Sequence, residues 1–507
     1  MDTHTPYDDV FYPTGIHQSV TVDRLYVMGK ILGVKPTPIE TATVLEIGCG
    51  DGMHILPHAW RHPQSKVVGL DYASTNITKA VECKSHLSID NIEFICADIQ
   101  DFTYSDYKFD YIIVHGLYAW VHDSIKEAIL LKCKEHLSEN GICVVSYNTM
   151  PGGHIRLMTR EIMRFHTQQF STTKDKVREA RAMIYFLAKA NSGMQSAYKY
   201  ILQEELKRIA SYPDAAFIHD DLGEIYTPIS FTDFINHASK HSLTYLGEAD
   251  FVEMNDEMPN EEITQVFKNL HKGDLLQKEQ YMDYLRYRRF RQTMLVHDHT
   301  DLKRVIDSCF LDSLFISINL TTETPTLIYD NSVVQFKDES GKGMGTDSPL
   351  VKAALVTVSA QYPKRFNTKE IVEMANKTLG LEESPTDLTT VQSVLLKMYY
   401  ADLIEVYAER AEISIDTEKP KLWEYAKQLL ELRLNIPTQN NVMYHVEGNV
   451  EREFLKLCDG TAHFRENVEA ISSLISSREL DWQKDEDVEE FLLKSIKACK
   501  KSGLLSN

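Results

Sequence analysis

The stretch Val44-Leu45-Glu46-Ile47-Gly48-Cys49-Gly50-Asp51-Gly52 begins with apolar residues and ends in three alternating glycines. An apolar run of this length that leads into a glycine-rich turn is typical of a buried strand followed by a helix. Glycine lets the backbone approach a ligand closely, and the start of a helix offers free N–H donors. The stretch therefore predicts an α/β fold with a ligand site at the end of a strand.

Two residues argue against a dinucleotide at this turn. The G-x-G-x-x-G motif of dinucleotide-binding folds needs its last glycine at position 53, where this chain has Met53. Glu46 on the strand would repel a pyrophosphate, whereas its carboxylate suits a ligand that carries an ammonium and a sulfonium group. We therefore expect a cationic ligand.

Short apolar runs and helical patterns alternate through the first 150 residues. The predicted strands are 44–48, 67–71, 92–98, 109–116 and 141–148. Helical spacing covers 74–87 and 124–137, with Ser74 and Ser124 as expected N-caps. Strands that alternate with helices predict right-handed crossovers and a parallel, doubly wound sheet.

Acidic residues end the next two predicted strands. Asp71 can accept both hydroxyls of a ribose, and Asp98 can accept the exocyclic amine of adenine while Ile99 flanks the ring. An aspartate at the end of a strand is also a common turn former, and a lone G-x-G-x-G is often only a tight turn. The order and spacing of the three features together favour a nucleoside site.

The glycine turn and the two acids resemble the class I S-adenosylmethionine-dependent methyltransferases over residues 40–150. This resemblance implies a Rossmann-like methyltransferase sheet and S-adenosylmethionine as the cofactor. It places the methionine part of the cofactor on the glycines, with its amine near Glu46. The residues implied to bind the cofactor are Tyr12, Glu46, Gly48, Cys49, Gly50, Gly52, Asp71, Tyr72, Asp98, Ile99 and His115.

Three further segments resemble a bacterial subgroup of this family that carries a methyltransferase regulatory domain. They are Tyr7-Asp8-Asp9 with Phe11-Tyr12-Pro13, which look like an N-terminal lid, then 146–152 (SYNTMPG) and 284–293 (YLRYRRFRQT). The subgroup includes the rickettsial protein lysine methyltransferases. Its plan implies a cofactor domain, a helical dimerisation insert, a middle domain and a C-terminal winged-helix part.

The methyl acceptor is expected beside the fourth strand, where 115–120 reads HGLYAW. Methyl transfer needs a nucleophile in line with the sulfonium, because the cofactor supplies the reactive methyl group. An amine acceptor must be neutral, which favours a dry pocket with aromatic rings and a few proton acceptors. The candidate catalytic residues are His115, Tyr118, Trp120 and Tyr147. Aromatic residues near a strand end are also common in protein cores, so both interpretations stay open.

The length of 507 residues predicts about three domains at roughly 150 residues each. We expect a cofactor-binding core over 1–153, a helical and dimerising insert over 154–213, a middle or regulatory region that completes the sheet over 214–300, a winged-helix-like domain over 301–434 and a helical domain over 435–507. The winged-helix prediction rests on three helical segments followed by an apparent strand pair over 404–415. The glycine-rich stretch 337–349 is expected to be a linker or loop.

The charge balance argues against nucleic acid as a partner. The chain has 54 basic and 74 acidic side chains, for a net charge of −20, and residues 301–507 hold 24 Lys and Arg against 34 Asp and Glu. The predicted winged-helix domain is therefore expected to contact protein. The run RYRRFR (286–291) indicates either a basic patch for an acidic partner or a solvated helix face with a structural arginine.

The chain ends and the cysteines indicate a cytoplasmic protein that does not insert into membranes. The N-terminus has no basic and apolar leader, and no apolar run is long enough to cross a bilayer. The eight cysteines lack paired spacing and are expected to be buried thiols, and no metal site is predicted.

The favoured function is methyl transfer from S-adenosylmethionine to a protein lysine, carried out by a homodimer. The lysine acceptor follows from the family resemblance alone. The alternatives are methylation of a small molecule, or a non-catalytic adaptor that binds S-adenosylmethionine and holds protein partners.

Overall fold

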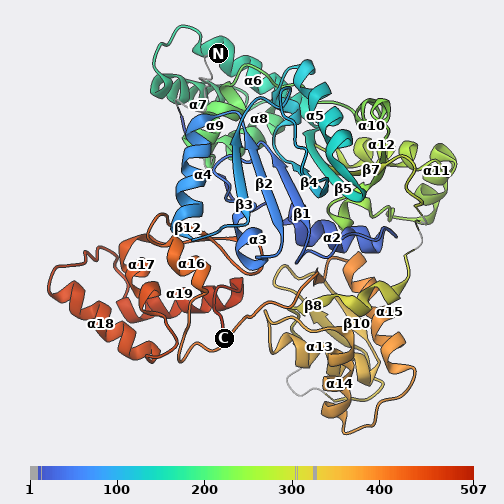
Figure 1. Ribbon diagram of the computed structural model, residues 1–507, viewed down its shortest axis with the longest axis vertical. Helices are drawn as coiled ribbons and strands as arrows, with labels where there is room; N and C mark the ends of the chain where they lie inside the picture. The colour runs from blue at the N-terminus through green and yellow to red at the C-terminus, as the bar shows by residue number, and fades with distance from the viewer. Residues whose placement is uncertain (1–9, 13, 303, 305, 324–327) are drawn as a thin grey trace.

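A seven-stranded sheet lies at the centre of the computed structural model, which describes residues 10–12, 14–302, 304, 306–323 and 328–507 (Figure 1). The strand order is β3-β2-β1-β4-β5-β7-β6. The strands are β1 (Thr43–Ile47), β2 (Lys66–Asp71), β3 (Ile92–Cys96), β4 (Phe109–Val114), β5 (Leu137–Asn148), β6 (Leu243–Glu248) and β7 (Phe290–His297). All of the predicted strands are present.

The first five strands are parallel, and β7 runs antiparallel to both of its neighbours, β5 and β6. The order 3-2-1-4-5 is that of doubly wound folds, and the inserted antiparallel strand distinguishes this sheet from the dinucleotide-binding order. The strand order changes direction between β1 and β4, because β2 and β3 lie on one side of β1 while β4 and β5 lie on the other. Ligands of such sheets bind outside the carboxyl ends of the strands at this point.

Four helices of the N-terminal part accompany the parallel strands. They are α2 (Val22–Ile31), α3 (Leu56–Arg61), α4 (Ser74–His86) and α5 (Asp123–His136). The positions of α4 and α5 confirm the predicted helices, but the prediction of Ser74 and Ser124 as N-caps is wrong. Both serines already lie in the first helical turn, because the helices begin one residue after Ala73 and His122.

Four helices lie between β5 and α10 and form the insert at the top of Figure 1. They are α6 (Gly153–Thr167), α7 (Thr173–Ala190), α8 (Ala197–Ala210) and α9 (Asp214–Leu222). The first three match the predicted helical segments, and α9 adds a fourth. The insert has a small apolar core of its own, made by Met163, Val177, Ala180, Ile184, Ile209 and Phe217.

The chain then returns to the sheet. The returning elements are α10 (Phe231–Lys240), β6, a short 3₁₀ helix η3 (Phe251–Met254), α11 (Glu261–His271), α12 (Leu275–Arg286) and β7. Phe231 and Phe234 on α10 pack into the same apolar cluster as the parallel strands. This confirms the prediction that the sheet resumes after the helices.

The first part of the C-terminal half pairs three helices with short strands. The elements are η4 (Ser308–Ser313), β8 (Phe315–Ile318), β9 (Val334–Lys337), β10 (Gly343–Thr346), α13 (Pro349–Ser359), α14 (Thr368–Leu379), α15 (Asp387–Tyr400) and β11 (Ile404–Tyr407). The three helices are as predicted. The strand pair over 404–415 is not, because β11 pairs with β8, whose Ile316 and Ile318 are fully buried. The expected loop 337–349 contributes β10 and the turn of the β9–β10 hairpin.

The last part of the chain is mainly helical. It contains α16 (Glu424–Leu429), β12 (Asn435–Pro437), β13 (Met443–His445), α17 (Gly448–Leu457), α18 (Phe464–Ser476) and α19 (Val488–Ser502). Figure 1 shows these helices below the sheet, beside the α13–α15 group. Leu422 and Trp423, just before α16, hydrogen-bond to the backbone of Cys458 and Leu504.

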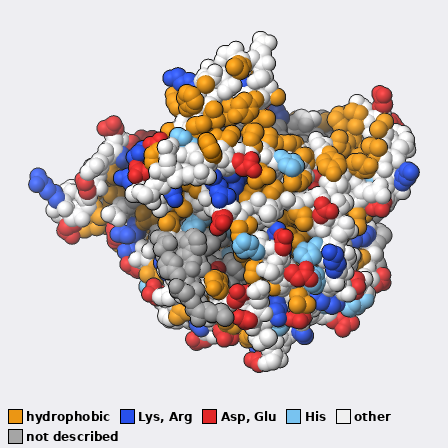
Figure 2. Space-filling model, turned by 90° about the horizontal axis from the view of Figure 1, so that it is seen from above, with side chains coloured by type: hydrophobic (Ala, Val, Ile, Leu, Met, Phe, Trp, Pro, Cys, Tyr) orange, Lys and Arg blue, Asp and Glu red, His pale blue; other side chains and the backbone are white. Residues whose placement is uncertain are grey.

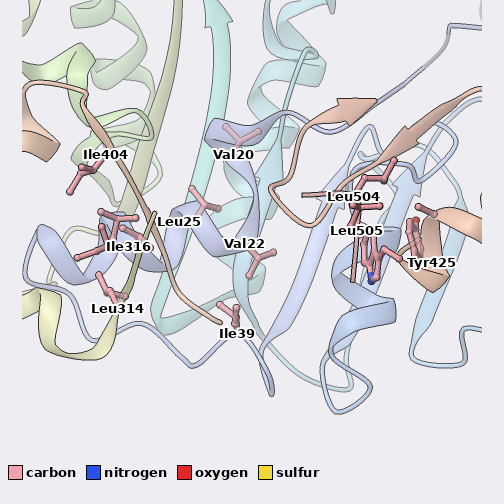
Figure 3. Close-up of a cluster of buried hydrophobic side chains, with 14 of the residues drawn as sticks. Val20, Val22, Leu25, Ile39, Leu314, Ile316, Ile404, Tyr425, Leu504 and Leu505 are labelled. Atoms are coloured by element: carbon pink, nitrogen blue, oxygen red, sulfur yellow. The ribbon is translucent and has the colours of Figure 1, made fainter. Parts of the chain in front are cut away.

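One apolar cluster joins the N-terminal part of the chain to its C-terminal half (Figure 3). Leu25 of α2 lies close to Ile316 and Ile404, while Leu505 and Tyr425 belong to the same cluster. All five side chains are at most 5% exposed. Continuous burial of this kind stabilises the contact between the two halves, so the C-terminal half is held against the sheet and is not a tethered module.

The cysteines and the helices bear on two further predictions. All eight cysteines are free, but Cys96 and Cys309 are exposed, so the expectation of buried thiols is wrong for these two. In the part of the chain that the structure describes, no helix combines the length and the apolar character that a membrane span requires.

Candidate active site

The glycine turn after β1 has a backbone that only glycine adopts readily. Gly48, Gly50 and Gly52 have φ values of +77°, +56° and +76°. A Cβ on Gly50 would overlap the side chain of Thr14, and a Cβ on Gly52 would overlap the ring of Phe94. The three glycines are therefore needed for the shape of the turn and for close packing by the N-terminal segment and β3.

The two acids at the strand ends hold backbone turns. Asp71 accepts hydrogen bonds from the N–H of Gly50 at 2.9 Å and of Ala73 at 2.8 Å. Asp98, half-buried after β3, accepts the N–H of Gln100 at 2.9 Å. Asp71 thus ties the glycine turn to the start of α4, in addition to the ribose contact that the sequence predicts.

Glu46 places a carboxyl group without a partner beneath the turn. Its side chain is buried, and Oε2 has no hydrogen bond within the described residues. Burial raises the pKa of Glu46 well above its usual value, and the charges of Asp71 and Asp51 raise it further. A buried, unpaired acid is costly. A cationic ligand would remove that cost, because its charge would favour the ionised carboxylate.

Asp51 receives an arginine from the C-terminal half. Its side chain is buried, and Nη1 and Nη2 of Arg433 each donate to Oδ2 at 3.2 Å. The hydroxyl of Thr14 donates to Oδ1. Residues from both ends of the chain therefore hold the glycine turn. Arg433 lies 382 positions from Asp51, and no local pattern in the sequence identifies this contact.

His115 follows β4 directly and lies beside the N-terminal segment. Its Nδ1 is buried and has no hydrogen-bond partner among the described residues. Its ring centroid lies 3.9 Å from that of His17 and 5.9 Å from that of Phe290. Burial, with smaller contributions from His17 and His54, lowers the pKa of His115 well below its usual value. The imidazole is therefore neutral near pH 7, and its buried Nδ1 can hydrogen-bond to a ligand.

Tyr118 and Tyr147 lie in the apolar core and contact Phe234 of α10. Their hydroxyls are already paired, Tyr118 with His237 Nδ1 at 2.6 Å and Tyr147 with Thr293 Oγ1 at 3.0 Å. Burial raises the pKa of both phenols. This placement favours a core role over the catalytic role predicted for the two tyrosines.

Trp120 lies against the insert. Its ring is tilted against that of Tyr226, with the centroids 4.9 Å apart, and the guanidinium groups of Arg156 and Arg160 lie 5.1 Å and 5.3 Å from the Trp120 centroid. Such contacts fix the indole between two segments of the chain. They give Trp120 a positioning role at the boundary between the sheet and the insert.

The N-terminal segment lies over the glycine turn. The Lys79 ammonium nitrogen lies 3.2 Å from the centroid of the Phe11 ring. The ring centroids of Tyr12 and of His219 on α9 are 5.7 Å apart. The segment thus contacts α4 and the insert as well as the turn. Of the residues expected to form the lid, Tyr7, Asp8, Asp9 and Pro13 lie outside the described residues.

The structure brings most of the predicted cofactor residues to one edge of the sheet. The carboxyl ends of β1 to β4 carry Glu46, Gly48, Cys49, Gly50, Gly52, Asp71, Tyr72, Asp98, Ile99 and His115. Cys49 and Ile99 are buried, whereas Tyr72 is 40% exposed. Sequence reasoning missed Thr14 and Arg433, which contact this edge from distant segments.

Two family descriptions match adjoining parts of the chain. Residues 40–211 match a family described as a methyltransferase domain, and residues 213–297 match one described as a predicted methyltransferase regulatory domain. The first range holds the glycine turn and α6–α8. The second holds α9–α12, β6 and β7.

Three proteins similar to this chain over much of their length come from Rickettsia species. The uncharacterized protein RP789 of Rickettsia prowazekii is 29% identical over 96% of this chain and 90% of its own length. The uncharacterized protein RP028 of the same organism is 36% identical over 46% of this chain and 94% of its own. The structure of PKMT2 from Rickettsia typhi in complex with AdoHcy is 27% identical, with a TM-score of 0.87 over 97% of this chain and 99% of that chain.

Proposed function

The chain belongs to the class I S-adenosylmethionine-dependent methyltransferases that carry a methyltransferase regulatory domain, and we propose that it methylates the side-chain amine of a protein lysine. Two observations support the lysine acceptor: the likeness to PKMT2 of Rickettsia typhi, and the resemblance of the sequence motifs to the rickettsial protein lysine methyltransferases. That likeness spans nearly the whole chain, including the insert and the C-terminal half.

The residues at the carboxyl edge fit the cofactor. S-adenosylmethionine supplies the reactive methyl group on a sulfonium when it is bound. Glu46 offers an unpartnered carboxyl to a cationic ligand, and the carboxyl groups of Asp51 and Asp71 add negative charge around the turn. We assign Gly48, Gly50 and Gly52 to the methionine part, Asp71 to the ribose, and Asp98 with Ile99 to the adenine.

His115 is the residue that we propose to act on the acceptor. A lysine amine must be neutral before it can attack, and a neutral imidazole can hydrogen-bond to that amine and orient it. His17 packs on the imidazole and Phe290 lies at its edge, which keeps the group shielded.

Incubation with S-adenosylmethionine and lysine-bearing proteins tests this proposal. We expect S-adenosylhomocysteine release that depends on added protein, and a mass gain of methyl groups on lysine. His115→Gln should lower kcat on the order of 100-fold, a larger effect than any loss of cofactor affinity. Methylation of a metabolite extract without protein methylation would favour the small-molecule alternative. Cofactor binding without any turnover would favour the adaptor.

We further propose that the insert mediates dimerisation. Apolar side chains gather in a broad patch on the upper side of the molecule (Figure 2). The insert contributes five apolar side chains that are each more than half exposed, namely Phe165, Tyr185, Phe186, Met194 and Tyr200. Light scattering should give a dimer mass, and Phe165→Lys with Phe186→Lys should give a monomer. Val333→Lys, at an exposed apolar site in the C-terminal half, should stay dimeric.

A further inference from the structure

Three potential metal ligands meet on the surface between α5 and α10. Glu127 lies on α5, His237 lies in the last turn of α10, and His241 follows that helix one turn later. His237 Nε2 lies 2.7 Å from Glu127 Oε2, and His241 Nε2 lies 3.0 Å from Glu127 Oε1. One ligand atom from each residue lies within 4.8 Å of the other two.

This arrangement has the donor set and the spacing of a zinc site. Histidines four residues apart lie on one face of a helix, and a carboxylate from a neighbouring helix supplies the third ligand. Zinc binds imidazole nitrogen at about 2.0 to 2.1 Å and carboxylate oxygen at about 2.0 to 2.2 Å, in a tetrahedral arrangement. Small rotations of the three side chains would bring their ligand atoms to these distances, with water as the fourth ligand.

The cluster is partly buried and is accessible from solvent. The side chain of His241 is 9% exposed, and its Nε2 lies 3.0 Å from Glu127 Oε1 inside the cluster. Glu127 itself is 57% exposed and leaves a route for an ion from solvent. The cluster therefore combines a buried imidazole nitrogen with access from outside.

The tyrosine behind the cluster can orient the first histidine. Tyr118 Oη lies 2.6 Å from His237 Nδ1, on the far side of the ring from Glu127. A histidine that binds metal through Nε2 carries its proton on Nδ1 and usually donates it to an oxygen of the protein. The Tyr118 oxygen is placed to accept that proton, which fixes both the tautomer and the ring.

We propose that Glu127, His237 and His241 bind one zinc ion that clamps the regulatory region to the methyltransferase domain. Glu127 belongs to the segment 40–211 and the histidines to the segment 213–297. The ion would also secure Tyr118, which follows β4 and the segment that contains His115. The sequence analysis predicted no metal, although the spacing of His237 and His241 is visible in the sequence.

Titration of untagged, chelator-treated full-length protein with Zn²⁺ tests the proposal, with a chromophoric chelator as competitor. We expect one Zn²⁺ per chain and an absorption spectrum of tetrahedral coordination when Co²⁺ is added instead. His237→Ala and His241→Ala should each weaken Zn²⁺ binding more than about 100-fold, and Tyr118→Phe about tenfold. His154→Ala, at an exposed histidine of α6, should bind as the wild type does.

Two results would overturn the zinc clamp. The first is a wild-type protein that binds Zn²⁺ no more tightly than the double variant His237→Ala/His241→Ala. The second is a Co²⁺ complex without tetrahedral absorption, which needs no variant and does not depend on the folding of any substitution. Circular dichroism of each variant separates the loss of a ligand from the loss of the fold.

Discussion

Two buried groups of ionisable side chains lie near the carboxyl ends of the parallel strands, and they differ in how their polar atoms are paired. At the start of β7, opposite Tyr147 of β5, Arg291 is fully buried and contacts Glu248, Asp283 and Glu279 at 2.5, 2.8 and 3.2 Å. At the β1 and β4 ends, Glu46 and His115 are each left with a buried polar atom that has no partner in the described structure.

This difference distinguishes a structural cluster around Arg291 from the candidate functional residues Glu46 and His115. Native proteins pair their buried polar groups, because an unpaired one costs free energy and gives nothing in return unless a ligand uses it. The Arg291 cluster is paired throughout and holds β6, β7 and α12 together. The unpaired atoms of Glu46 and His115 lie where the fold places a ligand, which makes them candidates for its binding and its chemistry.

Arg291→Met should have the largest effect on folding. It leaves Glu248, Glu279 and Asp283 buried without their central cation, and loss of one partner from a buried charge cluster typically costs about 3 to 5 kcal/mol. Urea unfolding measures this loss. Arg465→Met, at an exposed arginine of α18, should change the free energy of unfolding by less than about 1 kcal/mol. Equal losses in the two variants would contradict a structural role specific to Arg291.

Glu46→Gln should weaken cofactor binding without lowering the stability of the fold. Removal of the charge should weaken cofactor binding by about 1.5 to 3 kcal/mol, on the order of 10-fold to 100-fold, because a charge-assisted contact is lost. The free energy of unfolding should not fall, because the substitution removes a buried, unpaired acid. Calorimetry of binding and thermal melts measure the two quantities. Glu469→Gln, at an exposed site on α18, is the matched control, and a large loss of stability in Glu46→Gln would refute the comparison.

Arg433→Ala tests whether the C-terminal half supports the ligand site. It leaves Asp51 buried without its cation, and we expect a loss of about 1 to 3 kcal/mol in stability together with weaker cofactor binding. Arg465→Ala, at an exposed arginine of α18, should change neither property. Unchanged cofactor affinity in Arg433→Ala would mean that the contact only attaches the two halves.

The smallest effect should be a pH dependence of cofactor affinity. The pKa of Glu46 is raised in the free protein, so its stabilising effect on the fold is present below the unfolded pKa and is lost as pH rises through the raised pKa. A bound cation favours the ionised carboxylate. Binding therefore releases a proton, and affinity should increase with pH up to that raised pKa, by less than tenfold per pH unit. A pH dependence that persists in Glu46→Gln would assign it to another group.

The strands of the parallel sheet and the glycine turn could be predicted because they depend on local patterns. Apolar runs, helical spacing and the glycines of 48–52 each report on neighbouring residues. The RYRRFR run also contained the structural arginine, although only the structure shows that it is Arg291 and what surrounds it.

What could not be predicted depends on contacts between distant segments. Arg433 forms an ion pair with Asp51, which lies far away in the sequence. Strand β11 pairs with β8 and not with the residues that follow it. Tyr118 lies just after β4 and Tyr147 lies within β5, and both belong to the apolar cluster that Phe234 of α10 also joins. Local sequence gives no information on which later segment will cover a strand end.

The pairing of β5 with β7 also sets an order for biosynthesis. Cys143 to Asn148 lie opposite Leu295 to Phe290, so one edge of β5 has no partner until the ribosome has made the whole insert and α10 to α12. Until then the nascent chain exposes an unpaired, apolar strand edge, which is a hazard for aggregation. Chains truncated before β7 should therefore be insoluble.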